Sequence, residues 1–358
     1  MAAPKLIQIL ILTLFYYSSP SLASQQPTYN VVSFGAKPDG RSDTTKAFLS
    51  AWGAACATTA PATIYVPPGR YVLGNAYFTG KSCKNTAITI RIDGTLVAPS
   101  DYNALGRSGS WLEFERVAGV SIYGGTLDGR GAKLWSCKNS NSGRSCPKGA
   151  TSLAFYNSNN IIINGLTSLN SQMFHILVDG CQNAKLMNMR ISAPGNSPNT
   201  DGIHVQQSTG VTIMNSHIGT GDDCVSIGPG ASNLWIENLS CGPGHGISIG
   251  SLGWDMQEAG VQNVTVKTAT FTGTENGVRM KTWARPSNGV KISYVTYQDI
   301  HGTSATQVAV NFDCSKAYPC SGITLDEVNL TYGDKPATAS CANAGGTADG
   351  VVEPTSCL

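Results

Sequence analysis

Three aspartates offer the clearest chemistry in this sequence. Asp222 and Asp223 are adjacent, and Asp201 precedes them by about one repeat of a pattern described below. Carboxyl groups crowded together cannot all ionise at the same pH, so at least one should hold its proton to a higher pH than a free aspartate. A protonated carboxyl can give a proton to a leaving oxygen while ionised neighbours activate water. The arrangement suits acid–base hydrolysis of a glycosidic bond.

Further polar residues follow at the same spacing. His245, between two glycines, lies one repeat after the aspartate pair, and Arg279 and Lys281 lie beyond it. Arg279 and Lys281 are two residues apart and should share one face of a strand, as should Asn199 and Asp201. The alternative is a ladder of aspartates that caps turns or binds calcium. Because the carboxylates recur in step with a histidine and two cations, we favour catalysis and expect neither a metal nor a cofactor.

A short phrase of alternating apolar residues after Asn or Gly recurs along most of the chain, with a period of roughly 20 to 30 residues. It is found at 120–122, 161–163, 211–213, 234–236, 264–266, 290–292 and 323–325. One such unit cannot bury its apolar face alone, whereas stacked units can, because each strand pairs with its counterpart in the next coil. A β-sandwich would need more hairpin turns than the chain contains. The pattern therefore predicts an all-β fold, a parallel β-helix.

Two segments depart from this pattern. Residues 43–56 predict one short helix with Asp43 as N-cap and Phe48, Trp52 and Cys56 on one face, which would cover the open first coil. Residues 133–150 are rich in Ser, Lys, Gly and Cys and predict a disulfide-pinned loop. No linker divides the chain, so residues 24–358 are expected to form one domain.

The N-terminus predicts export. Lys5, the apolar run 6–17 and the small residues ending at Ala23 are typical of a signal peptide over residues 1–23. Eleven cysteines suit an oxidising compartment, and neighbours along the chain suggest five pairs, with Cys181 left over as a buried, inert thiol. The suggested pairs are Cys56–Cys83, Cys137–Cys146, Cys224–Cys241, Cys314–Cys320 and Cys341–Cys357. Asn238, Asn263 and Asn329 lie in glycosylation sequons.

The charge pattern excludes nucleic acids as partners. The net charge is +2, and the lysines and arginines are dispersed, so the chain lacks the basic stripe that nucleic-acid binding needs. No other segment is apolar enough to cross a membrane. We expect a secreted, monomeric protein that binds an anionic ligand only locally.

Four motifs, in order and context, resemble glycoside hydrolase family 28, the pectin-cleaving hydrolases that include plant polygalacturonases. They are 197–202 (SPNTDG), 219–224 (GTGDDC), 241–246 (CGPGHG) and 278–281 (VRMK). The similarity covers nearly all of residues 24–358. It implies a single-stranded right-handed parallel β-helix like that of pectate lyase, and hydrolysis of α-1,4 bonds between galacturonate residues of pectin in the cell wall.

The resemblance also implies roles for the residues. Asp222 would be the general acid, Asp201 and Asp223 would activate water, and the anomeric carbon would be inverted. His245 would support the acid or contact substrate. Arg279 and Lys281 would hold the galacturonate carboxylate, and Asn199 would orient the patch.

Two more histidines are weighed from their positions. His175 lies one repeat before Asp201 and is a weaker candidate for lining a sugar subsite. His204 follows Asp201 by three residues, so on a straight strand it should face away and be structural.

The sequence departs from the family after Lys281. The family continues through a further coil whose tyrosine reaches the substrate, whereas here 282–288 leads almost directly to 290–292. A shortened β-helix with weak hydrolase activity is therefore one hypothesis, because a repeat fold can lose a unit. A catalytically silent pectin-binding protein is the second, and a calcium-dependent pectate lyase the third. Neither the cleavage mode, internal or terminal, nor the preferred pectic glycan follows from the sequence.

Overall fold

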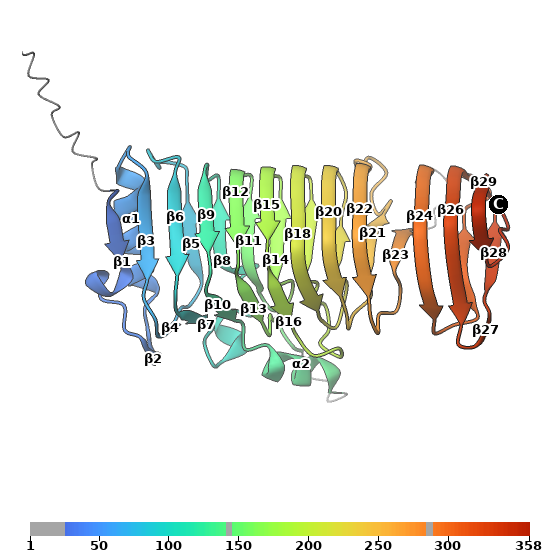
Figure 1. The fold of residues 1–358 in the computed structure, drawn as a ribbon. Coiled ribbons are helices and arrows are strands. Elements are labelled where there is room, and N and C mark those ends of the chain that lie inside the picture. The colour runs from blue at the N-terminus through green and yellow to red at the C-terminus, as the bar shows by residue number, and fades with distance from the viewer. Residues whose placement is uncertain (1–25, 141–144, 284–288) are drawn as a thin grey trace, which may run out of the picture.

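The computed structural model describes residues 26–140, 145–283 and 289–358, and it is a solenoid of parallel strands (Figure 1). The expected signal peptide, residues 1–23, lies outside the described residues. Each coil of the solenoid contributes strands to three faces, and a strand pairs in parallel with its counterpart one coil away. The predicted fold, a right-handed parallel β-helix, is confirmed.

Strands on the first face are β1 (Thr28–Asn30), β3 (Ala62–Val66), β6 (Ile88–Ile92), β9 (Val120–Tyr123), β12 (Asn159–Asn164), β15 (Gln182–Met187), β18 (Thr209–Gly219), β20 (Ser232–Cys241) and β22 (Gln262–Phe271). The second face holds β2 (Asp39–Asp43), β4 (Arg70–Val72), β7 (Thr95–Val97), β10 (Thr126–Asp128), β13 (Thr167–Leu169) and β16 (Arg190–Ser192). It merges with the first face at β18, which pairs with both β15 and β16.

The third face positions the site. Its strands are β5 (Ala76–Thr79), β8 (Ser110–Glu115), β11 (Thr151–Tyr156), β14 (Ile176–Asp179), β17 (Ile203–Gln206), β19 (Val225–Ile227), β21 (Ile247–Leu252) and β23 (Val278–Thr282). Inward side chains alternate with outward ones along each strand, because successive residues of a strand point to opposite faces. Residues paired across the coils therefore form rows on the outer surface.

Rows of aliphatic side chains fill the interior. One row on the first face is in register from coil to coil and is buried from Ile64 onward, ending at the partly buried Val266. Its members are Ile64, Ile90, Ile122, Ile163, Leu186, Ile213, Ile236 and Val266. Each inner side chain thus packs between the coils above and below, which is how short repeats bury a continuous core.

Asparagines form ladders along the corners of the solenoid. Asn164, Asn188, Asn215 and Asn238 follow strand segments of successive coils, and the last three have φ between 50° and 54°. Their side chains pair in the ladder, Asn188 Nδ2 donating to Asn164 Oδ1 at 2.8 Å and Asn238 Nδ2 to Asn215 Oδ1 at 2.8 Å. Asparagine tolerates the left-handed backbone region better than other side-chain-bearing residues. Asn160, Asn233 and Asn263, which precede the recurring apolar phrase, have φ between 53° and 56°, so the same backbone preference explains why the phrase follows Asn or Gly.

The N-terminal cap has the predicted faces. Helix α1 (Thr45–Ala57) buries Phe48, Trp52 and Cys56 and lies against the first coil, beside β1 and β3 (Figure 1). The 3-10 helix η1 (Val31–Phe34) lies next to it, and η2 (Tyr102–Ala104) follows β7. The N-cap is Thr44 and not the predicted Asp43, whose side chain accepts from the Thr45 N–H at 2.8 Å.

The interrupting segment is partly helical. Helix α2 (Ala132–Asn139) begins it, so the prediction of a plain loop over 133–150 was wrong, although the Cys137–Cys146 bridge does close it. All five predicted disulfides form, and Cys181 is buried and unbridged. Burial raises the pKa of the Cys181 thiol to about 11, which fits an inert thiol. Within the described residues no helix is long and apolar enough to span a membrane.

The hydrogen-bonded ladder stops once along the axis. The C-terminal strands form separate sheets, and neither β22 nor β23 pairs with them (Figure 1). They are β24 (Ser293–Ser304), β26 (Cys320–Tyr332), β27 (Lys335–Pro336) and β29 (Ala344–Glu353) in one sheet, and β25 (Val308–Asp313) and β28 (Thr338–Ala342) in another. In the described residues the ladder is therefore interrupted where the sequence predicts a missing coil.

Candidate active site

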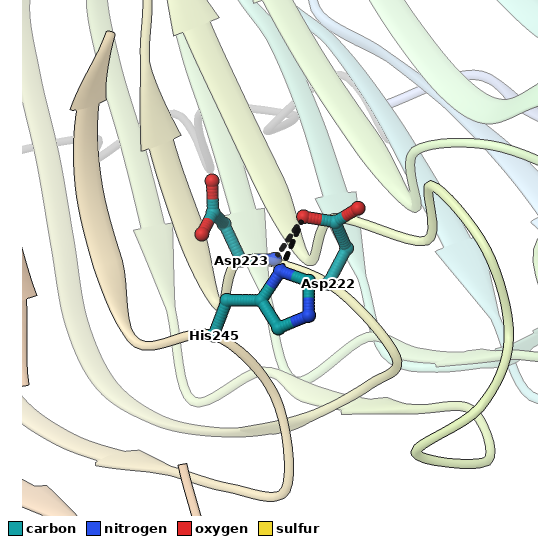
Figure 2. A group of neighbouring side chains, drawn as sticks. All are labelled: Asp222, Asp223 and His245. Atoms are coloured by element: carbon teal, nitrogen blue, oxygen red, sulfur yellow. Dashed lines mark hydrogen bonds and ion pairs between the residues drawn. The ribbon is translucent and has the colours of Figure 1, made fainter. Parts of the chain in front are cut away.

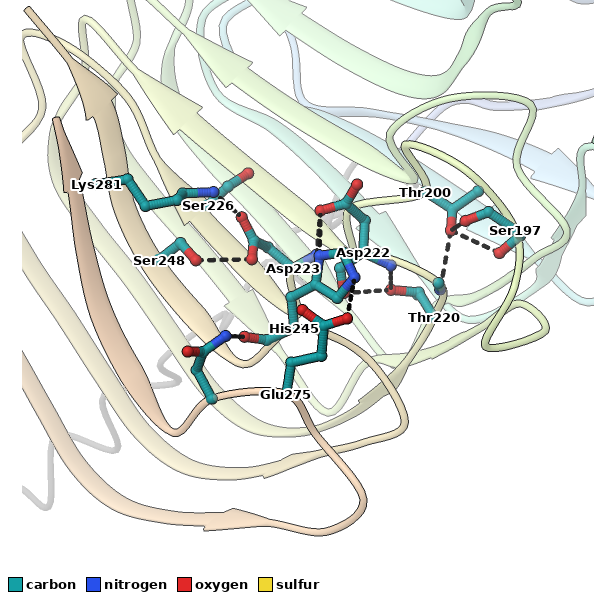
Figure 3. Close-up of polar contacts among 12 residues, drawn as sticks. Ser197, Thr200, Thr220, Asp222, Asp223, Ser226, His245, Ser248, Glu275 and Lys281 are labelled. Atoms are coloured by element: carbon teal, nitrogen blue, oxygen red, sulfur yellow. Dashed lines mark hydrogen bonds and ion pairs between the residues drawn. The ribbon is translucent and has the colours of Figure 1, made fainter. Parts of the chain in front are cut away.

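The predicted catalytic residues lie in stacked turns that lead into the third face. Asp201 precedes β17, Asp222 and Asp223 precede β19, and His245 precedes β21. Backbone bonds join successive turns: Gly202 N–H donates to Asp223 O at 2.9 Å, and His245 N–H donates to Asp222 O at 2.9 Å. The one-repeat spacing thus places Asp222, Asp223 and His245 beside one another, as predicted (Figure 3), with the turn of Asp201 bonded to that of Asp223.

Asp222 is oriented by two hydrogen bonds to one oxygen. Its Oδ1 accepts from the backbone N–H of Asp223 at 2.8 Å and lies 3.1 Å from His245 Nδ1 (Figure 2). The other ring nitrogen of His245 lies 3.5 Å from Glu275 Oε1. His245 is therefore positioned between two carboxyl groups, and the second oxygen of Asp222 points away from the imidazole ring in Figure 2.

Asp223 pairs with two cations. Its side chain is 2% exposed; Lys281 Nζ lies 3.0 Å from Oδ2, and Arg279 Nη2 lies 3.1 Å from Oδ1. Ser248 donates to Oδ1 at 2.7 Å and accepts from Arg279 Nε at 2.9 Å. Arg279 and Lys281 alternate with Met280 on β23, so both face outward as predicted. Asp223 is thus a buried carboxylate whose charge is compensated by Arg279 and Lys281 on β23.

Asp201 is the carboxyl of the cluster whose pKa is raised. It is 7% exposed, and burial, followed by the charge of Asp222, raises its pKa from 3.8 to about 7. The expectation that one member of the cluster holds its proton to a higher pH is confirmed in Asp201. Thr200, its buried neighbour, accepts from the Gly221 N–H at 3.1 Å and so ties the Asp201 turn to the Asp222 turn.

The cluster contains atoms that a metal ion could use. Asp222, Asp223 and His245 each offer a ligand atom, and these atoms lie within 4.8 Å of one another. However, both oxygens of Asp223 already contact Arg279 or Lys281. A bound cation would have to compete with these two side chains, so the donor set fits acid–base chemistry better than metal binding.

Two predicted site residues are placed differently from expectation. His175 is fully buried, its Nδ1 bonds Ser168 Oγ at 2.8 Å, and burial lowers its pKa to about 3. It cannot line a sugar subsite, because its side chain points into the coil. Asn199 lies in an exposed turn with φ of 56°, so it does not share a strand face with Asp201.

Sequence reasoning missed an outward row on the third face. His204, Ser226, Ser248 and Arg279 are paired from coil to coil, so His204 stands in the row that ends at Arg279. The expectation that His204 faces away from the site was wrong, because the chain turns after Asp201 and the strand begins only at Ile203. The signal was present in the sequence: His204 lies between buried Ile203 and Val205, which places it on the outer face.

Comparisons with known proteins agree with this architecture. The curated relatives include a polygalacturonase of Prunus persica, 55% identical over 383 residues, covering 96% of this chain and 97% of the relative. An exopolygalacturonase of Platanus acerifolia is 39% identical over 372 residues, covering 92% and 98%. The endo-xylogalacturonan hydrolase structure of Aspergillus tubingensis matches with a TM-score of 0.74 at 23% identity, over 90% of this chain and all of that one, and supports the fold.

The match to the family profile consists of two segments that meet just after Lys281. The family described as Glycosyl hydrolases family 28 matches residues 56–287 and 284–357, and the two segments meet where the sequence predicts a missing coil. The 383-residue alignment with the Prunus persica relative is also longer than this chain of 358 residues, so it contains gaps. With the profile covering most of the chain and with relatives this similar over nearly their full length, the chain belongs to glycosyl hydrolases family 28.

Proposed function

We propose that this protein hydrolyses the α-1,4 bonds between galacturonate residues of pectin. The observation that carries the proposal is the contact of a carboxylate cluster with two outward cations, Arg279 and Lys281, on one coil surface. Carboxyl groups supply the acid and the base, and the cations suit a substrate that bears a carboxylate on every sugar. The relatives named polygalacturonase support the same substrate.

In the proposed reaction Asp222 gives its proton to the leaving glycosidic oxygen. Its free oxygen is the one not held by His245 and the Asp223 amide. Asp223, together with Asp201 in its ionised form, draws a proton from the attacking water, which reaches the anomeric carbon from the opposite side, so the new reducing end is inverted. His245 holds Asp222 in position and is in turn positioned beside Glu275.

Arg279 and Lys281 recognise the substrate carboxylate. The guanidinium uses Nε for Ser248 and Nη2 for Asp223, which leaves further N–H donors for a planar anion. The side chains of Arg279 and Lys281 are 27% and 31% exposed, so a galacturonate can reach them without displacing Asp223. The same two cations then serve the catalytic carboxylate and the substrate.

The proposal includes export to the cell wall and action as a monomer. Five disulfides fit an extracellular protein, and the three sequon asparagines, Asn238, Asn263 and Asn329, have exposed side chains that a glycosyltransferase can reach. The partner is pectin itself, and binding to nucleic acid or to a membrane is not part of the proposal.

The other two hypotheses have less support. A silent pectin-binding protein would need no raised carboxyl pKa at Asp201 and no histidine beside Asp222. A calcium-dependent lyase would need carboxylate oxygens free for the ion, whereas those of Asp223 contact cationic side chains. The hydrolase is therefore preferred.

Reducing-end release from polygalacturonate by the purified chain tests the proposal. We expect release without the ultraviolet absorbance of an unsaturated product and without loss in chelator. Product sizing over time shows whether cleavage is internal or terminal. A chain that is folded by circular dichroism but releases nothing refutes the hydrolase, and absorbance with chelator sensitivity indicates the lyase.

A further inference from the structure

Helix α2 and the residues that follow it lie in the same line of turns as the candidate active site. They join β10 of the second face to β11 of the third, just as the turn that contains Asp201 joins β16 to β17 two coils later. The turn between them, residues 170–175, is bonded to the Asp201 turn, because His175 N–H donates to Asp201 O at 2.8 Å. Figure 1 shows α2 below the ends of β13 and β16. The segment therefore flanks the proposed catalytic residues.

Two lysines of this segment lie near each other. Lys138 is in the last turn of α2, and Lys148 lies three residues before β11. The Cys137–Cys146 disulfide is next to Lys138 and two residues before Lys148, so it brings the two together. Lys138 Nζ lies 3.6 Å from Met173 Sδ, in the turn between β13 and β14. This lysine pair, Lys138 and Lys148, is therefore held against the line of catalytic turns.

The lysine pair has no anionic partner in the described part of the chain. No carboxylate of residues 26–140, 145–283 or 289–358 forms an ion pair with either side chain. Burial, followed by the charge of Lys148, lowers the pKa of the partly buried Lys138. A cation that is partly buried beside another cation is destabilised, and an anion that contacts both removes this repulsion. The lysine pair is therefore suited to bind a carboxylate.

The neighbouring strands of the third face have the opposite charge. Glu113 and Glu115 point outward from β8, because they alternate with the buried Leu112 and Phe114. Asp179 points outward from β14, in the same row as Glu115. These carboxylates repel a polyanionic glycan that lies over the strands before β17. Such a glycan is therefore directed to the turns, where the lysine pair lies.

We propose that Lys138 and Lys148 form a second carboxylate subsite, which binds a galacturonate unit on the opposite side of the scissile bond from Arg279 and Lys281. The proposal rests on the proposed hydrolysis and adds where a remote carboxylate of the same glycan chain binds. The proposed catalytic carboxyl groups lie between the two cationic groups along the axis. The substrate is thus held by its acid groups on both sides of the bond that breaks.

The distance between the two cationic groups sets the length of glycan that can use both. Met173, the contact of Lys138, lies in the coil of β14, and Arg279 lies on β23. These strands are four pairings apart, through β17, β19 and β21, which is about 19 Å at about 4.8 Å for each pairing. A galacturonate dimer is too short to reach across this distance, whereas longer oligomers reach both groups. Affinity should therefore rise with length.

Calorimetric titration with galacturonate oligomers of increasing length tests the subsite. The full chain carries Asp222→Asn in every titration, so that the ligand is not consumed. We expect longer oligomers to bind this parent more tightly than the dimer does. Addition of Lys138→Met and Lys148→Met together, which keeps the aliphatic stems, should weaken the binding of long oligomers about tenfold and change that of the dimer little. Lys138→Arg in place of Lys138→Met should restore part of the loss, because the charge is kept.

Two controls separate the subsite from the overall charge of the protein. Lys133→Met removes an exposed lysine of the same helix and should bind long oligomers as tightly as the parent. Fully methyl-esterified oligomers have no carboxylate, so their affinity should not depend on the lysine pair.

Three results would overturn the proposal: equal affinity of the parent and the double lysine variant for long oligomers, an equal loss in Lys133→Met, or no binding of long oligomers to the parent. Hydrolysis by the wild type together with any of these results refutes the subsite alone. Lysine-dependent binding without hydrolysis by the wild type refutes the proposed reaction and leaves the subsite in place.

Discussion

Residues 26–283 and residues 289–358 both contain parallel strand pairs, but the two regions differ in how much apolar side chain they bury. In the first region aliphatic rows pass through many coils and form one core of fully buried side chains, such as Ile163 and Ile213. In the second region the packed cluster of buried side chains is small and comprises Val310, Leu325 and Val328 among the described residues. A coil with neighbours on both sides buries its whole interior, whereas a coil at an open end does not.

The proposed catalytic residues all belong to the first region, but they lie toward its open end. Arg279 and Lys281 are on β23, the last strand of the third face before the interruption. On the same coil Val264 and Val266 of β22 are only partly buried. The comparison therefore teaches that the proposed catalytic residues are all positioned by paired coils, while the strand that carries Lys281 has no paired coil beyond it in the described residues.

The largest effect is expected from Asp222→Asn in the first region. The asparagine keeps the contact with the Asp223 amide but has no acidic proton to give, so the rate should fall by roughly 10²–10⁴-fold. The matched control is Asp313→Asn, an exposed aspartate of β25 in the second region, which should keep the wild-type rate. Initial rates of reducing-end release measure both, and similar losses in the two variants would break the comparison.

Asp201→Asn should lower the activity and raise the stability of the protein at neutral pH. The folded pKa of about 7 lies above the ordinary 3.8, so the folded state binds the proton more tightly, and stability falls as pH rises from about 4 to 7. The cost at neutral pH is on the order of 4 kcal/mol, from about three pKa units. The variant should thus unfold at higher urea than the wild type at pH 7.5 and equally at pH 4. Parallel pH dependence in both proteins would contradict the assignment.

Two truncations in one aliphatic row compare an inner coil with the end coil. Ile213→Ala should destabilise the protein by about 3 kcal/mol, because the side chain is fully buried between two coils. Val266→Ala at the end of the row should cost about 1 kcal/mol, since its side chain is already partly exposed. Urea unfolding gives both values. Equal losses would mean that β22 is covered by a further coil in solution.

Insertion of one coil tests the interruption itself. A coil-length segment of the same repeat, placed between Thr282 and Val290, should pair with β22 and β24 and bury Val264, Val266 and Phe271. We expect a gain of about 2 kcal/mol and slower hydrogen exchange in β24 and β26. An insertion of equal length rich in Gly and Ser is the control. Unchanged exchange in the coil chimera would show that the two regions are already joined.

Much of this architecture could be predicted from the sequence. The period of the apolar phrase indicated the β-helix, and the stacking of coils brought Asp201, Asp222 and His245 together because the repeat converts sequence spacing into spatial contact. The five disulfides followed from neighbouring cysteines, since cysteines close along the chain meet in the same or the next coil.

The wrong predictions concern residues in turns, where the repeat period does not determine which way a side chain points. Alternation was applied to Asn199 and His204 as though a straight strand ran through them, yet Asn199 lies in a turn and β17 begins at Ile203. His175 stacks on Asp201 through its backbone, His175 N–H to Asp201 O at 2.8 Å, while its side chain enters the core. Spacing predicted the neighbour correctly, but the side-chain direction depends on local backbone angles that spacing does not contain.

The central claim is that the stacked turns of the first region hydrolyse an α-linked galacturonate with water delivered opposite Asp222. The most direct test is a time-resolved proton NMR spectrum of the purified full chain with polygalacturonate, recorded before the new reducing ends mutarotate. We predict that the β-anomer appears first, and that Asp222→Asn produces neither anomer on the same timescale. An initial α-anomer, or no product from folded wild-type protein, would contradict the account.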